Sequence, residues 1–305
     1  MDRSSSYYKQ VSLLVRVLPY ISEEKSFALK GGTAINLFVR AFPRLSVDID
    51  LAYLPLEPRG QALTNVREAL SRLAGKLNQL PDLTAQVQDN KPDEMRVIVS
   101  SGQAQIKVEV SPVMRGVLYP PITQDIVESV EDEFGFASMA VVSMADLYGG
   151  KLCAALDRQH PRDLFDVKLL LEAEGVSRSI LNGFFTYLLS HNRPIAEVME
   201  PRWKDIEGIF ANEFVGMTFA PVTLDELLAV REKMLEALKM HFTSRDAEFL
   251  ISFKSGEPDW SLFEHPEIQH LPAVKWKLTN IQKMGEEKHR LALENLKVVL
   301  EEWLA

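Results

Sequence analysis

The sequence predicts an α/β front domain followed by a mainly helical domain. Three observations support this fold class: helical and extended patterns alternate up to about residue 120, extended patterns fade beyond it, and the two halves differ in charge. A chain of 305 residues is also long enough for two domains. We therefore expect a front domain at residues 1–120 and a helical domain at residues 121–305.

The front half alternates between amphipathic helix patterns and short strands, with Gly-Gly, proline and Ser-Gly positions between them. The predicted elements are a helix at 7–20, a strand at 27–31, a helix at 33–42, a strand at 46–54, a helix at 60–79, and strands at 95–101 and 104–112. This order is typical of an α/β domain.

The back half shows helical spacing interrupted by prolines that mark loops. The predicted helices lie at residues 143–157, 162–174, 178–190, 223–242 and 279–304.

Composition and charge exclude several classes of protein. Hydrophobic residues at 46% and charged residues at 25% are typical of a globular chain and exclude long disorder. The net charge of −9 argues against a uniformly basic, nucleic-acid-binding surface. Residues 1–120 carry 15 basic and 12 acidic side chains, whereas residues 121–305 carry 19 and 31. A local basic groove in the front domain is therefore still compatible with the charge.

The cellular compartment follows from what the chain lacks. Cys153 is the single cysteine, so no disulfide can form within the chain. The N-terminal residues have no signal-peptide pattern, and no apolar run reaches the roughly 20 residues that a membrane span needs. We expect a cytoplasmic protein without a membrane span.

The most informative motif is Asp48-Ile49-Asp50. Alternate residues of a strand lie on one face, so the two carboxylates are close together. Like charges at this distance repel each other, and a divalent cation is the usual remedy. The alternative is an amphipathic edge strand whose acidic face meets water.

Two further features stand near this motif. Gly31 and Gly32 lie between a predicted strand and a predicted helix, where backbone N–H groups can bind an anion; the alternative is an ordinary helix start with Thr33 as N-cap. Glu109 lies on a later strand, and it converges with Asp48 and Asp50 if the two strands are neighbours. Three carboxylates would suit two magnesium ions; alternatively, Glu109 is a solvated strand residue.

These motifs carry a resemblance to a known family. The segments that match are Lys30–Thr33, Arg44–Asp50, Asp146–Leu152, and Arg158 followed by Arg162–Asp166. In this order they resemble the AbiEii/AbiGii toxin family, a branch of the DNA polymerase β-like nucleotidyltransferases. The resemblance implies a nucleotidyltransferase fold, with a small mixed sheet flanked by helices and a helical C-terminal domain that completes the active-site cleft.

The resemblance also implies an activity. Members of the family transfer a nucleoside monophosphate from a nucleoside triphosphate (NTP) in a Mg²⁺-dependent reaction and release pyrophosphate. We expect Mg²⁺ as the cofactor of this chain, with Mn²⁺ as the alternative ion. Several act on the 3′ end of tRNA acceptor stems and so block translation. The family commonly pairs with a separately encoded antitoxin. We accordingly expect an NTP, a tRNA and an antitoxin as partners.

Site residues follow by matching the family's motifs to this chain. The resemblance implies catalytic roles for Asp48, Asp50, Lys151, Asp166 and Glu109, metal binding by Asp48 and Asp50, and nucleotide binding by Gly31, Gly32, Thr33, Arg44, Ser46 and Lys151. Arg158, Arg162 and Asp163 are secondary candidates. We favour Asp166 over Asp163 because it follows two hydrophobic residues and precedes Val167, which indicates a face turned half inward.

Simpler interpretations exist for some of these residues. Arg158, Arg162, Asp163 and Asp166 could form a structural ion-pair network, Lys151 could be an exposed helix lysine, and Arg44 an exposed arginine. In some family members a serine near D-x-D is phosphorylated. A phosphate on Ser46 would repel the triphosphate.

Three functions are consistent with the sequence. The first is a toxin that transfers nucleotides to RNA, with the tRNA 3′ end as the expected acceptor. The second keeps the chemistry but modifies a protein side chain or a small molecule such as an aminoglycoside, and the acidic back half would suit such a polycation. The third is a catalytically silent module that binds a nucleotide or an antitoxin.

Overall fold

The computed structural model describes residues 5–88, 94–102 and 104–305. They fall into two compact units, Met1–Ser143 with Gly216–Pro221, and Met144–Val215 with Val222–Ala305. The division lies at Ser143 and not near residue 120, because the segment between them adds strands to the sheet of the first unit.

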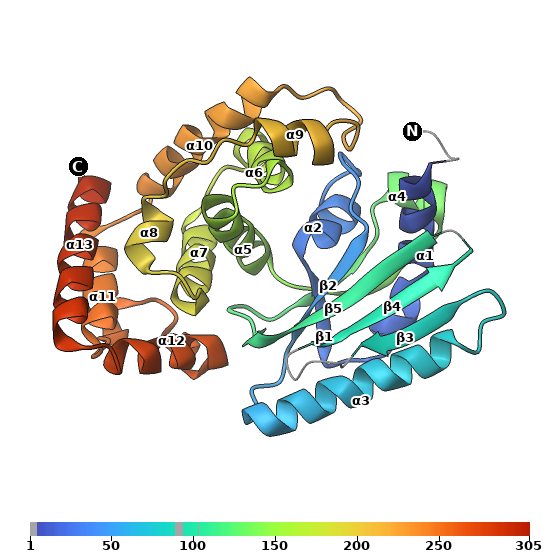
Figure 1. The fold of residues 1–305 in the computed structure, drawn as a ribbon, viewed down its shortest axis with the longest axis horizontal. Helices are drawn as coiled ribbons and strands as arrows, with labels where there is room; N and C mark the ends of the chain where they lie inside the picture. Colours follow the sequence, from blue (N-terminus) through green and yellow to red (C-terminus); the bar gives the residue numbers. More distant parts are fainter. Residues whose placement is uncertain (1–4, 89–93, 103) are drawn as a thin grey trace. The chain divides into compact units, whose positions relative to one another are not determined.

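The first unit contains a mixed sheet of seven strands in the order β3-β4-β5-β2-β1-β7-β6 (Figure 1). The strands are β1 (Phe27–Lys30), β2 (Asp48–Tyr53), β3 (Thr84–Gln88), β4 (Arg96–Ser101), β5 (Ala104–Arg115), β6 (Ile122–Asp125) and β7 (Ser138–Val141). The pairs β2–β5 and β1–β7 are parallel, and the other pairs are antiparallel. The mixed sheet with flanking helices confirms the predicted fold class.

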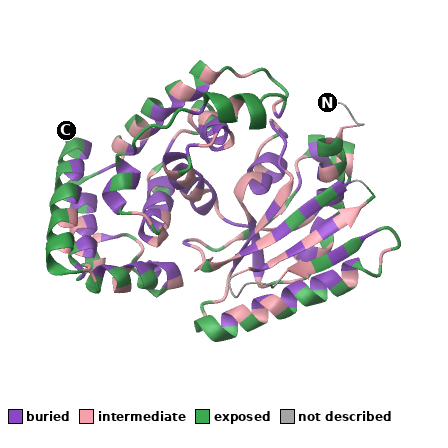
Figure 2. Cartoon of the chain, viewed as in Figure 1, coloured by how far each residue is buried: buried purple, intermediate pink, exposed green. Residues whose placement is uncertain are grey.

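Buried and more exposed residues alternate along the strands of the sheet (Figure 2), as expected when successive side chains lie on opposite faces. On one face Ile49, Leu51 and Val108 are fully buried. Helix α1 (Ser6–Ser22) packs on β5 and β7, and helix α3 (Arg59–Leu77) packs on β3 and β4. The other face carries Asp48 and Asp50, and on this side Asp50 packs against the first turn of the helix that follows β1.

The helix after β1 begins earlier than the sequence predicts. It starts at Gly31 as α2 (Gly31–Ala34) and continues as a π-helical turn, η1 (Ile35–Val39). The residue before it, Lys30, is the N-cap and makes no side-chain capping bond. Thr33 therefore lies inside the helix, and the interpretation of Thr33 as its N-cap is wrong.

The segment between residue 120 and Ser143 is the main error of the sequence-based fold prediction. It contains β6, α4 (Glu128–Phe134) and β7, which belong to the first unit. Each of these strands has four residues, which is too short for an alternating pattern to stand out. They form because β7 pairs with both β1 and β6. The five-residue β3 was missed for the same reason.

The described part of the second unit contains helices and loops. Its α-helices are α5 (Met144–Asp157), α6 (Pro161–Ala173), α7 (Arg178–Ser190), α8 (Ile195–Met199), α9 (Glu207–Glu213), α10 (Leu224–Lys239), α11 (Ser244–Ser255), α12 (Pro272–Gln282) and α13 (Glu286–Leu304). The predicted helix at 279–304 is two helices, because α12 ends at Gln282 and Gly285 is the N-cap of α13. Within the described residues, no helix combines the length and apolarity needed to cross a membrane.

Helices α5 and α7 pack closely through glycines. A Cβ atom at Gly149 would lie 2.3 Å from the carbonyl carbon of Gly183, and one at Gly183 would lie 2.0 Å from the carbonyl oxygen of Ala145. A Cβ atom at Gly150 would lie 2.8 Å from the ring of Tyr187. The Gly149-Gly150 pair before Lys151 is therefore explained by helix packing, which fixes the position of the lysine that follows.

We predict that Gly183→Ala destabilises the second unit by about 1–3 kcal/mol, because the new methyl group meets backbone atoms that can move only if the helices separate. Urea or thermal unfolding measures this change. The control is Gly208→Ala in α9, where no atom lies within 4 Å of the added Cβ. Equal stabilities of the two variants would contradict the close helix packing.

Candidate active site

The site of the first unit is built on the register of four adjacent strands. Lys30 at the end of β1 lies opposite Asp50 of β2, and Asp50 lies beside Glu109 of the parallel strand β5. Glu109 in turn lies opposite Arg96 of β4. The four residues form a row across the sheet in which two carboxylates stand between two cations. The strands that carry Asp50 and Glu109 are thus neighbours, as their expected convergence requires.

Glycine is required at position 31 by both conformation and space. Gly31 has φ +74°, in the left-handed region, and a Cβ atom there would lie 2.6 Å from Oδ2 of Asp50. At Gly32 a Cβ atom would lie 2.7 Å from Nη2 of Arg44 and 3.0 Å from Oγ of Ser46. The space left by the two glycines is occupied by the carboxylate and the guanidinium, which are thereby held against the first turn of α2.

Thr33 and Ser46 connect this turn to β2. The hydroxyl of Thr33 donates to the carbonyl oxygen of Asp48 at 2.5 Å, and its oxygen lies 3.0 Å from Oγ of Ser46. Thr33 has one hydroxyl proton, so Ser46 is the donor between the two hydroxyls. Thr33 is fully buried and Ser46 is 9% exposed. Both side chains therefore fix the start of the D-x-D strand.

Arg44 is buried, with 3% of its surface exposed, so it is not the exposed arginine that we considered as an alternative. Its Nη1 donates to the carbonyl oxygen of Leu45 at 2.7 Å. The same segment forms a β-bridge from Arg44 to Thr218, and the N–H of Leu45 donates to the carbonyl oxygen of Met217 at 2.9 Å. The segment Gly216–Pro221 thus holds Arg44 in place beside Gly32.

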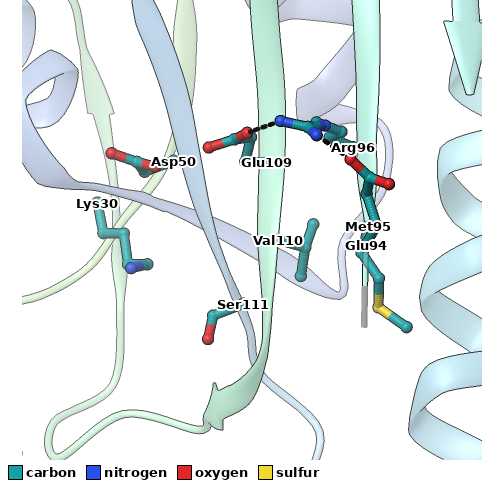
Figure 3. A pocket seen from close by; sticks show the side chains of 8 residues that line it. All are labelled: Lys30, Asp50, Glu94, Met95, Arg96, Glu109, Val110 and Ser111. Atoms are coloured by element: carbon teal, nitrogen blue, oxygen red, sulfur yellow. Dashed lines mark hydrogen bonds and ion pairs between the residues drawn. The ribbon is translucent and has the colours of Figure 1, made fainter. Parts of the chain in front are cut away.

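Glu109 has a partner of its own. Its Oε1 lies 3.2 Å from Nη1 of Arg96, and Nη2 of Arg96 contacts Glu94. Figure 3 shows Glu109 between Asp50 and Arg96. No group of three or more His, Cys, Asp or Glu side chains in the described ranges is arranged to hold a metal ion. Metal binding by Asp48 and Asp50 and a catalytic role of Glu109 as a third carboxylate both stay predictions.

The second unit contains a buried cluster around Lys151. The ammonium of Lys151 lies 2.8 Å from Oδ1 of Asp163 and 3.0 Å from Oδ2 of Asp166. All three residues are at most 7% exposed, so Lys151 is not an exposed helix lysine. Arg158, which is largely exposed, reaches Asp163 at 2.9 Å. Both aspartates are buried, so burial does not favour Asp166 over Asp163.

Two other residues of this unit, Arg162 and Cys153, lie against neighbouring residues of the protein. Nη2 of Arg162 lies 3.5 Å from the ring of His160. Cys153 is buried, and its burial raises the pKa of the thiol to about 12, as expected for a core residue.

The sequence analysis gave no role to Lys30 or Arg96. Both line one cavity together with Asp50 and Glu109. Lys30 was visible as part of the Lys30–Thr33 motif, and Arg96 as the one basic residue of its strand. Their connection depends on strand order and register, which no local pattern shows.

A family model and a solved structure that match this chain both describe nucleotidyltransferase toxins. The model of the family described as "Nucleotidyl transferase AbiEii toxin, Type IV TA system" matches residues 12–280. No curated protein matches in sequence. The structure is similar to MenT4, a nucleotidyltransferase toxin from Mycobacterium tuberculosis, with a TM-score of 0.62 and 14% identity over 98% of this chain and 95% of that one. This likeness supports the fold.

A second solved structure, a tRNA-processing enzyme in an apo form, matches at 12% identity over 95% of this chain and 97% of that one, with a TM-score of 0.25, and we draw nothing from it. The family match spans most of the chain and includes the D-x-D strand, the Gly31-Gly32 turn and the Lys151 cluster. The chain therefore belongs to the AbiEii family and is a nucleotidyltransferase toxin of the type IV toxin–antitoxin class.

Proposed function

We propose that this toxin transfers a nucleoside monophosphate from an NTP to the 3′ end of tRNA in a Mg²⁺-dependent reaction, and so blocks translation. The supporting observation is the pair Asp48 and Asp50 on one strand face, with Asp50 packed on the Gly31 turn. The acceptor hydroxyl oxygen bonds to the α-phosphorus, the bond from the α-phosphorus to the bridging oxygen breaks, pyrophosphate leaves, and the hydroxyl proton passes to water. Family membership implies the NTP substrate and an antitoxin partner.

The donor set of the D-x-D pair suits Mg²⁺. Within the described residues, neither carboxylate of Asp48 and Asp50 has a hydrogen bond or an ion pair. Proteins usually hold Mg²⁺ through one or two carboxylates, with phosphate oxygens and water as the other ligands. Asp48 and Asp50 would hold the ion, which when bound stabilises negative charge on the attacking and leaving oxygens.

The triphosphate would lie at the start of α2. The first N–H groups of a helix lack partners within it and favour an anion. The backbone at Gly31, Gly32 and Thr33 offers these groups, and the guanidinium of Arg44 beside Gly32 adds positive charge. Ser46 lies in the same contact group, so a phosphate on its hydroxyl would disturb the turn as well as repel the triphosphate.

The roles of Lys151 and Asp166 stay predictions. We propose that Lys151 neutralises charge on the leaving pyrophosphate and that Asp166 keeps this lysine protonated and oriented. The short contacts of Lys151 with two buried carboxylates support the proposed role of Asp166 in keeping this lysine protonated and oriented. The same contacts also indicate a structural role, which a stability measurement separates from catalysis.

The proposed reaction is tested with Mg²⁺, each labelled NTP and total RNA. We expect label in RNA, and Asp50→Asn should lower its incorporation by about 1,000-fold, equivalent to roughly 4 kcal/mol of transition-state stabilisation. EDTA should abolish it. Asp125→Asn, at an exposed position of the same unit, is the control. Label in a small-molecule or protein fraction instead of RNA would contradict the proposed acceptor.

We predict that Gly31→Ala lowers activity by about 100-fold with only a modest loss of stability. The new methyl group displaces the end of the flexible Asp50 side chain and not backbone atoms. Gly175→Ala is a matched control, because Gly175 has φ +73° but no atom within 4 Å of the added Cβ. Both variants bear the left-handed strain of about 1–2 kcal/mol. Equal activities of the folded variants would contradict the role of Gly31.

We predict that Lys151→Met destabilises the protein by about 3–5 kcal/mol, because it leaves two buried carboxylates without their lysine. Lys168→Met should change stability by at most about 1 kcal/mol, since its ion pair with Glu172 lies at the surface. Urea unfolding of both variants measures the difference. A stable but inactive Lys151→Met protein would show that the lysine serves catalysis and not the fold.

A further inference from the structure

The row of charges across the sheet borders a cavity of about 430 Å³. Its lining comprises Lys30, Asp50, Glu94, Met95, Arg96, Glu109, Val110 and Ser111 (Figure 3). Among the described residues, Gly31 and Gly32 are not part of this lining. Asp50 borders this cavity and also packs on the Gly31 turn to which we assign the triphosphate, so an acceptor hydroxyl bound in the cavity would lie next to the same carboxylate.

Arg96 is the residue of this cavity best suited to a phosphate. Its guanidinium is held at the cavity edge by Glu94 and Glu109, and its side chain is still 32% exposed. A guanidinium has five N–H donors in a planar fork that matches phosphate oxygens. The two contacts with carboxylates leave donors for a ligand. Lys30 adds a second cation in the lining, on β1.

The charge balance of the lining disfavours a polycationic acceptor. With Asp50 engaged by Mg²⁺, the acids that remain in the lining are Glu94 and Glu109, and both contact Arg96. An ammonium group would have to compete with the guanidinium for them. A phosphate would instead meet Arg96 and Lys30, while Met95 and Val110 offer apolar surface to a sugar or a base.

We propose that this cavity binds the acceptor strand of RNA and that Arg96 binds a phosphate next to the attacking hydroxyl. The inference rests on the proposed function, since it assigns a place to the RNA acceptor. It makes Arg96 a specificity-determining residue that selects a polynucleotide end over a cationic small molecule.

Binding of unfractionated tRNA over a series of salt concentrations, without NTP, tests the contact. Removal of one phosphate contact by Arg96→Met should make the slope of log K against log[salt] less steep by about 0.7–0.9. Arg16→Met is the matched control, because it also removes an ion-paired arginine of this unit, whose partner is Asp82. Arg96→Lys should bind tRNA with an affinity between those of the unchanged protein and Arg96→Met. Lysine keeps the positive charge but lacks the planar fork of N–H donors.

A second variant distinguishes phosphate binding by Arg96 from a structural effect of removing its side chain. Glu94→Gln releases one of the two carboxylates that hold Arg96, so tRNA affinity should rise a few-fold. An unchanged or lower affinity would overturn the inference, as would a salt slope for Arg96→Met equal to that of Arg16→Met. Melting temperatures measured in parallel confirm that each variant is folded.

The transfer assay separates this inference from the proposed function. Arg96→Met should raise the KM for RNA by about 10-fold and leave the KM for NTP unchanged, which a general loss of structure would not do. Label in RNA with an unchanged KM for RNA would overturn the role of Arg96 and leave the proposed function intact. Label only in a small-molecule or protein fraction would overturn the RNA acceptor itself.

Discussion

The close approach of Asp50 to Gly31 is the constraint on which the rest of the site depends. The carboxylate occupies the space where any other residue would carry a Cβ atom, and the positive φ of Gly31 turns the chain from β1 into α2 at this point. At Gly32 the guanidinium of Arg44 takes the equivalent space. A Gly-Gly turn is usually explained by the approach of a ligand. In this protein the two glycines make room for the side chains of Asp50 and Arg44, which we propose bind the metal ion and the triphosphate.

Electrostatics follow from this packing. Asp50 and Glu109 are neighbours on parallel strands, an arrangement that costs free energy unless cations stand nearby. Arg96 supplies that compensation to Glu109 through an ion pair, and a metal ion would supply it to Asp50. In the second unit the negative charge of two buried aspartates, Asp163 and Asp166, is compensated by one buried lysine, Lys151. In both places an ion pair compensates carboxylate charge: Arg96 with Glu109, and Lys151 with Asp163 and Asp166.

The secondary structure was predictable where the patterns were long. Helix α3 and the strand with Asp48 and Asp50 lie close to their predicted positions, since each carries several repeats of its period. The prediction failed for β6 and β7, which are too short to show a period and exist because they pair with other strands. The assignment of Thr33 as an N-cap failed because the helix begins at Gly31, whose glycine conformation starts the turn two residues earlier.

The sequence by itself determined the chemistry available: two carboxylates on one strand face, a Gly-Gly pair before a helix, and a lysine followed by an R-D-x-x-D segment. A period of two or of 3.6 residues decides which side chains share a face, and it is encoded locally. The tertiary structure alone decided which strands are neighbours and at what offset. That offset places Lys30, Glu109 and Arg96 in line with Asp50, because register depends on pairing between segments far apart in the chain.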